Sequence, residues 1–140
     1  MRRIICDVGI VISGLLSSKG PPAAVLDAWR EGLFDIVVSP LWLAELDRVV
    51  VRPHIAKYVD PRDAAELREA IVRQAVFVDD PPALPGVTPD PGDDYLVALA
   101  RACGADVLVS GDRHLVDLKD PRPPVLTPRR FVDEFLPPGP

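Results

Sequence analysis

Four carboxylates occupy positions from which a folded α/β chain could bring them together. Asp7 ends an apolar stretch, Glu45 lies in the first turns of a predicted helix, Asp94 begins another helix, and Asp112 follows a predicted strand. Carboxylates that converge without Lys or Arg repel one another, and a divalent cation turns such a cluster into a favourable one. Oxygen ligands suit Mg²⁺ or Mn²⁺ better than zinc. Two such ions can activate water against a phosphodiester, so the pattern favours phosphodiester chemistry.

Each of these acids also has an ordinary structural interpretation. Asp94 could only cap its helix, and Asp112 could be a turn residue after a glycine. Glu45 could be an exposed helix residue, although it shares a helix face with Leu41 and is therefore expected beside the core stripe. Asp7 is the hardest to explain in this way, because three buried-type residues precede it. It is the joint arrangement that points to a site.

Length and composition are those of one globular domain. The chain has 140 residues, 48% of them apolar, and we expect one domain over residues 1–136 with a disordered or extended tail at 137–140. No apolar run approaches the ~20 residues that span a bilayer, and the N-terminal stretch is too short for a signal peptide. Cys6 and Cys103 are expected as buried thiols in a reducing compartment, although a disulfide is not excluded. We therefore expect a cytoplasmic protein without a membrane partner.

The net charge of −5 argues against an extended basic surface for binding a polyanion. The four acids account for four of these five net charges, and bound cations would neutralise them locally. The composition therefore permits a metal-bridged phosphate site.

Strands and helices alternate along the whole chain. The strands are predicted at 2–7, 34–38, 75–78, 106–109 and 125–126. The helices are predicted at 11–16, 21–29, 40–52, 61–74, 94–103 and 128–136, with a proline-rich loop at 81–91. Such alternation predicts a three-layer α/β/α domain around a doubly wound, mainly parallel sheet of about five strands. Its working crevice lies beyond the carboxyl ends of the strands, where the strand order reverses. Asp7 and Asp112 should meet there, at adjacent strand ends.

Four segments resemble the PIN domain family, and within it the toxin-like group that includes the VapC ribonucleases. The segments are IICDVGIVISGLL, VVSPLWLAELDRVV, DPGDDYLVALARACGADVLVSGDRHL and VLTPRRFVDEFL. The resemblance implies a metal-dependent endoribonuclease with Asp7, Glu45, Asp94 and Asp112 as catalytic metal ligands for Mg²⁺ or Mn²⁺. It also implies a homodimer and a small antitoxin whose segment covers the acidic groove. Neighbouring acids at 90 and 93 could assist or replace Asp94.

The chain departs from the family pattern at two places. Val8 and Gly9 stand where the family usually has a Thr-Asn or Thr-Ser pair, so side-chain hydrogen bonds beside the first acid are missing and weakened activity is expected. His114 stands where an acid or amide is common, and it is expected as an exposed turn residue rather than a ligand.

Three other functions were compared with the nuclease. A haloacid-dehalogenase-type phosphatase would need an acid at Gly9 as its proton donor. A receiver-type signalling domain would need paired acids after the first strand and a lysine after the last, and neither is present. A catalytically decayed PIN-like module that binds RNA or a protein partner stays open, because all four acids are retained.

Two arginines are candidates for contact with the phosphates of an RNA substrate. Arg113 follows Asp112 directly, and Arg129 begins the last predicted helix at the expected rim of the crevice. Trp29, Trp42 and the four phenylalanines are expected in the core, so no platform for stacking bases is predicted. Recognition of a structured RNA by its shape fits this pattern better.

Overall fold

The computed structural model describes residues 2–82, 94–118 and 122–137. This part of the chain contains a five-stranded sheet whose order is β3-β2-β1-β4-β5 and whose neighbouring strands are all parallel. The strands are β1 (Arg3–Cys6), β2 (Asp35–Val38), β3 (Val76–Phe77), β4 (Val107–Val109) and β5 (Val125–Leu126). The strand order reverses between β1 and β4, where Cys6 lies opposite Val109. The predicted doubly wound parallel sheet is confirmed.

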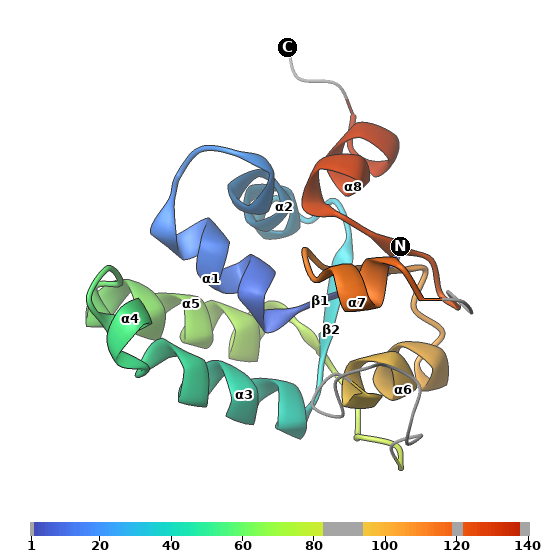
Figure 1. Ribbon diagram of the computed structural model, residues 1–140, viewed down its shortest axis with the longest axis horizontal. Helices are drawn as coiled ribbons and strands as arrows, with labels where there is room; N and C mark the ends of the chain where they lie inside the picture. Colours follow the sequence, from blue (N-terminus) through green and yellow to red (C-terminus); the bar gives the residue numbers. More distant parts are fainter. Residues whose placement is uncertain (1, 83–93, 119–121, 138–140) are drawn as a thin grey trace.

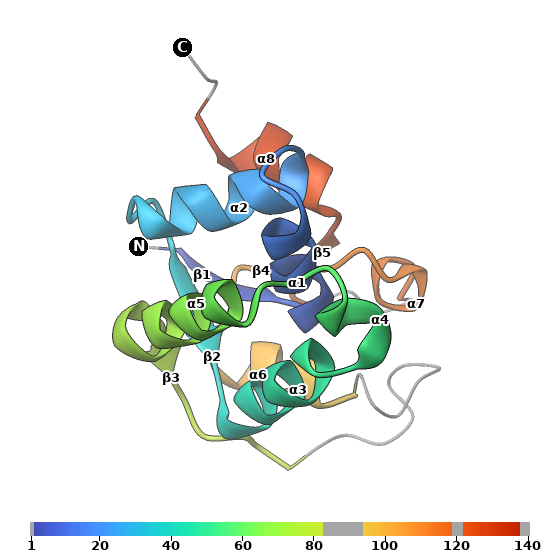
Figure 2. The same cartoon turned by 90° about the vertical axis from the view of Figure 1, so that its left-hand side faces the viewer.

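Helices cover both faces of this sheet (Figures 1 and 2). On one face lie α1 (Val8–Leu16), α2 (Pro21–Arg30), α3 (Pro40–Val50), α4 (Pro53–Ala56) and α5 (Pro61–Gln74). On the other lie α6 (Asp94–Ala102) and α7 (Arg113–Val116), and α8 (Pro128–Phe135) packs beside α2. The result is the expected three-layer arrangement.

Capping side chains followed by proline begin three of the helices. Ser39, Asp60 and Thr127 each accept a hydrogen bond from a backbone N–H of the first helical turn, at 3.2, 2.8 and 3.2 Å. Proline follows each of them and loses nothing there, because the first helical N–H has no partner inside the helix. At the other end of α6, Gly104 adopts a φ of 67°, a left-handed conformation that glycine reaches without strain. These boundaries were all predicted.

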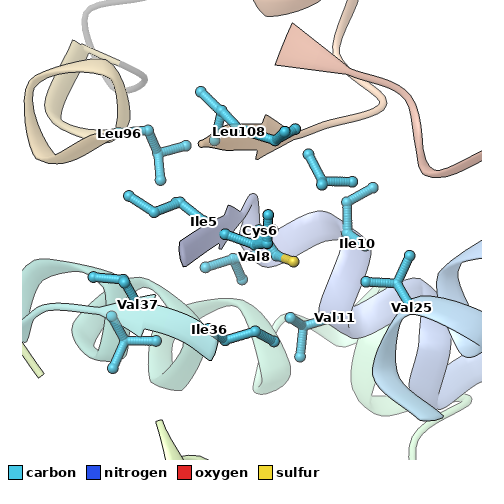
Figure 3. Close-up of a cluster of buried hydrophobic side chains, with 14 of the residues drawn as sticks. Ile5, Cys6, Val8, Ile10, Val11, Val25, Ile36, Val37, Leu96 and Leu108 are labelled. Carbon is cyan, nitrogen blue, oxygen red and sulfur yellow. The ribbon is translucent and has the colours of Figure 1, made fainter. Parts of the chain in front are cut away.

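The core lies on both sides of β1 and β4. Figure 3 shows Leu96 of α6 beside Ile5 and Leu108, which are opposite one another in the β1–β4 register. On the opposite face Val11 of α1 lies against Ile36 of β2. All five side chains are at most 1% exposed. Because both faces are covered, the strands are continuous apolar runs rather than alternating ones.

Several local predictions were wrong. Helix α1 begins at Val8 rather than at residue 11, because the Asp7 side chain caps it and lets the helix start directly after β1. The third helix does end before Pro53, but Pro53 itself opens α4, where a proline at the first position fits. A short helix, α7, follows Asp112, so His114 is an exposed helical residue rather than a turn residue.

Two apolar side chains that were expected in the core are exposed. Leu41 is 50% exposed, because α3 buries Trp42 and Leu46 and places Leu41 and Glu45 one residue further round the helix. Phe77 is 45% exposed on the edge strand β3. The proline-rich loop at 81–91, the acids at 90 and 93, and the tail beyond residue 137 fall largely or wholly outside the described residues.

The two cysteines are free, Cys6 buried and Cys103 half-buried. Burial, with a smaller contribution from the charge of Asp7, raises the pKa of the Cys6 thiol to about 12. Among the described residues no single helix is long and apolar enough to cross a membrane. Helices α1 and α2 pass that test only as a pair, across a 99° bend, and both bury side chains in the core.

Candidate active site

Asp7 and Asp112 are joined through one buried serine. Asp7 follows β1 and its backbone N–H donates to the Val109 carbonyl of β4 at 2.9 Å. Ser110, which is fully buried, donates its hydroxyl to Asp7 Oδ2 at 2.9 Å and accepts the Asp112 backbone N–H at 3.0 Å. The expectation that these two acids lie at adjacent strand ends is confirmed. They lie where the strand order reverses, the position at which doubly wound sheets bind ligands.

Both acids also begin a helix. Asp7 Oδ1 accepts the Gly9 N–H at 3.0 Å at the start of α1, and Asp112 Oδ1 accepts the His114 N–H at 2.9 Å at the start of α7. Asp112 is therefore a helix cap rather than the turn residue that the structural interpretation allowed, and a capping role is compatible with a site.

Glu45 is held by Tyr95, the residue that follows Asp94. Glu45 lies on α3 and is half-buried, and the Tyr95 hydroxyl donates a hydrogen bond to its Oε2. Asp94, the residue before Tyr95, begins α6 and is only 4% exposed. Helices α3 and α6 approach from opposite faces of the sheet (Figure 1), so this contact closes the site across the sheet.

Charges from further acids converge on Tyr95. Burial first, and then the hydrogen bond and charge of Glu45, raise the pKa of Tyr95 above its ordinary value, and the charges of Asp7 and Asp80 add to this shift. The hydroxyl therefore stays a hydrogen-bond donor. The charges of Glu45, Asp7 and Asp80 thus all act on the Tyr95 hydroxyl.

Asp80 is an acid of this edge that the sequence analysis did not single out. It follows β3, and its Oδ2 accepts the Leu41 N–H at the start of α3 at 2.9 Å. Its Oδ1 is buried and has no hydrogen-bond partner within the part of the chain that the structure describes. A buried carboxylate oxygen without a donor is costly, and a nearby cation would remove that cost.

The residues present fit a hard divalent cation by their chemistry. The donor set is all carboxylate and includes one orphaned buried oxygen. Within residues 2–82, 94–118 and 122–137, however, no three His, Cys, Asp or Glu side chains stand close enough to hold a metal ion. The printed contacts link Asp7 with Asp112 through Ser110, and Glu45 with Tyr95, the neighbour of Asp94; the described residues do not gather the four acids into one compact cluster.

Val8 and Gly9 leave a gap beside Asp7. Gly9 lies in α1 and does not have a positive φ, so an asparagine at this position would not strain the backbone. A Cβ at Gly9 would lie 3.7 Å from Asp7 Oδ1, an ordinary van der Waals distance. Val8 is 1% exposed, and a threonine there would bury a hydroxyl. The two positions therefore differ in what a substitution would cost.

The two candidate phosphate-binding arginines are exposed. The side chain of Arg113 on α7 is 93% exposed, and its Nε lies 3.9 Å from Asp117 Oδ2. This long ion pair leaves the guanidinium accessible. Arg129 lies in the first turn of α8, which follows the carboxyl end of β5 and so begins at the same edge of the sheet as Asp112.

Sequence reasoning missed three residues of this edge: Ser110, Tyr95 and Asp80. Each carried a signal that the strand-end rule could have used. Ser110 and Asp80 come just after β4 and β3, and Tyr95 follows a predicted site acid. Which atoms they contact could not be read from spacing, because the partners are 39 to 103 positions away.

A doubly wound parallel sheet places this chain among the α/β proteins, which bind ligands at the edge where the strand order reverses. The chain belongs to the PIN domain family, whose pattern matches residues 3–114. Proteins of this family are generally nucleases that use divalent metals, so the chain has a nuclease fold. The chain is also similar to an uncharacterized protein of Methanocaldococcus jannaschii, at 24% identity over 143 residues that cover 95% of this chain and 91% of that protein.

Proposed function

We propose that this protein is a metal-dependent endoribonuclease that cleaves RNA phosphodiester bonds. The observation that carries the proposal is the linkage of Asp7 to Asp112 through Ser110 at the point where the strand order reverses. This linkage holds the Asp7 carboxylate and the Asp112 backbone directly after two neighbouring strands, and rigid elements hold a site more accurately than loops do.

In this proposal Asp7, Glu45, Asp94 and Asp112 hold Mg²⁺ or Mn²⁺, which when bound supplies charge stabilisation and a more acidic water. The chain's own residues orient the metal ligands and position the substrate. Ser110 and the Gly9 N–H each occupy one oxygen of Asp7 and so limit its rotation. Arg113 and Arg129 bind phosphates at the rim and position the substrate without reading its bases.

The direct experiment is cleavage of a mixed RNA pool by the purified chain with Mn²⁺, with Mg²⁺ and with EDTA. Fragments are expected with either cation and none with EDTA. Equal cleavage in EDTA would contradict metal dependence, and an intact pool under all conditions, with the protein folded, would favour the decayed module.

Mn²⁺ is expected to raise the melting temperature, because it binds the folded site and not the unfolded chain. At a free Mn²⁺ concentration about 100 times the dissociation constant, the free energy of unfolding rises by ~2.7 kcal/mol. Calorimetry with and without Mn²⁺ measures it, with Asp7→Asn as the comparison. An equal rise in both proteins would show that Asp7 is not a ligand.

Gly9→Asn is expected to increase cleavage, because an amide beside Asp7 restores a hydrogen-bonding group of the kind whose loss costs ~10- to 100-fold. Gly9→Ala is the matched control, since it adds the same Cβ without the amide. Initial rates of RNA cleavage are compared at saturating Mn²⁺. If alanine raises the rate as much as asparagine, helix stabilisation rather than the amide is responsible. Val8→Thr is better tested separately, because it buries a hydroxyl.

The finer part of the proposal has two components. The protein is a toxin that a small antitoxin holds inactive, and it forms a homodimer. This finer part rests on the resemblance of the sequence and on a groove of about 370 Å³ between α3, α4 and α5, lined mainly by apolar side chains such as Val50, Val59 and Ala64. Residues 47–60 beside it carry two arginines and a lysine against two aspartates, and the lining residue Asp47 pairs with Arg68. An antitoxin segment with apolar side chains would complement the apolar lining of this groove. Sedimentation of the purified chain tests the dimer.

A further inference from the structure

We infer that Tyr95 is a positioning residue that holds Glu45 in the geometry the site needs. The inference rests on the proposed metal-dependent nuclease and concerns how its Glu45 ligand is kept in place.

The contact joins parts of the chain that nothing local would bring together. Tyr95 and Glu45 are 50 positions apart, and their helices lie on opposite faces of the sheet. Tyr95 is half-buried and its side chain packs against the hydrophobic core. The position of the Tyr95 hydroxyl is therefore fixed by the fold.

Glu45 needs such a partner. It lies on the row of α3 that also carries the half-exposed Leu41, where packing alone does not select one rotamer. A free glutamate loses up to about 2 kcal/mol of rotamer entropy when it is fixed. The Tyr95 hydroxyl fixes Oε2 in the folded protein, and Oε1 has no hydrogen-bond partner among the described residues.

The chemical type of the donor also matters. A lysine or arginine in this place would neutralise Glu45 and compete with a cation for it. A tyrosine hydroxyl donates one hydrogen bond and leaves the full negative charge on the carboxylate. Tyr95 thus orients Glu45 without lowering its affinity for a cation, as outer-shell partners of metal ligands do.

Mn²⁺ affinity, measured by titration calorimetry on the folded chain well below its melting temperature, tests the inference. Tyr95→Phe should weaken Mn²⁺ binding by ~10-fold or more, the typical effect of removing an outer-shell partner. Tyr58→Phe is the matched control: Tyr58 is the other tyrosine of the chain and is 71% exposed, so its variant should bind Mn²⁺ as the wild type does.

A mutant cycle separates positioning from a general structural effect. In a Glu45→Gln background, Tyr95→Phe should cause little further loss, because Tyr95 acts through the Glu45 carboxylate. In RNA cleavage the single variant Tyr95→Phe should lower kcat and leave the KM for RNA nearly unchanged.

Two results would overturn the inference alone: wild-type affinity in Tyr95→Phe, or the same loss with and without the Glu45 carboxylate. A wild-type chain that binds no Mn²⁺ at all would instead overturn the proposed function, and the inference with it.

Discussion

Asp7→Asn is expected to lower RNA cleavage by ~10³-fold or more while the protein stays folded. A bound metal ion contributes several kcal/mol of transition-state stabilisation, and each 1.36 kcal/mol is tenfold in rate. In the proposed site, loss of the Asp7 charge removes a metal ligand at the switch point of the sheet. Asparagine is nearly the same size and is an equally good helix cap, so the capping of α1 through the Gly9 N–H can persist.

The control is Asp63→Asn, because Asp63 is an exposed acid in the first turn of α5. It should leave the rate unchanged. Circular dichroism and thermal melting of both variants check the fold. If the protein is a toxin, its expression should arrest bacterial growth and Asp7→Asn should relieve that arrest. Cleavage within a few-fold of wild type in Asp7→Asn would remove the proposed site, because every other assignment depends on this acid.

Trp42→Ala is expected to destabilise the protein by about 3–5 kcal/mol, the usual cost of truncating a buried tryptophan. Trp42 is fully buried, and its indole Nε1–H donates to the Cys6 carbonyl at 2.7 Å. It therefore packs α3, the helix of Glu45, against the end of β1, the strand that leads to Asp7. Urea unfolding measures the loss, which is a large part of the 5–15 kcal/mol typical of a domain.

Trp42→Phe divides this effect into its two causes. It keeps most of the ring but removes the donor, so it should cost only about 1–3 kcal/mol, the price of a buried carbonyl left without a partner. If Trp42→Phe were as damaging as Trp42→Ala, the hydrogen bond rather than the packed volume would anchor α3. A cost below about 1 kcal/mol for Trp42→Ala would contradict the burial of this side chain.

The sequence by itself determined the order of the elements and the edge at which the acids lie. Buried strands such as IIC and VLV have no polar face, so they must be covered on both sides, and this requires helices between parallel strands. Ser39-Pro40, Asp60-Pro61 and Thr127-Pro128 fix three helix starts through local hydrogen bonds. Since Asp7 and Asp112 directly follow strands, parallel pairing places both at one edge.

Only the tertiary structure decided which side chains meet at that edge. The bond from Ser110 to Asp7, the bond from Tyr95 to Glu45 and the cap that Asp80 places on α3 join residues 103, 50 and 39 positions apart. Such contacts depend on strand order and on the rotation of each helix, and neither is encoded in local spacing. The same reason explains the exposure of Leu41, which was expected in the core. A rotation of 100° per residue separates Leu41 from Trp42 on α3, and the helix packs against the sheet with Trp42 buried.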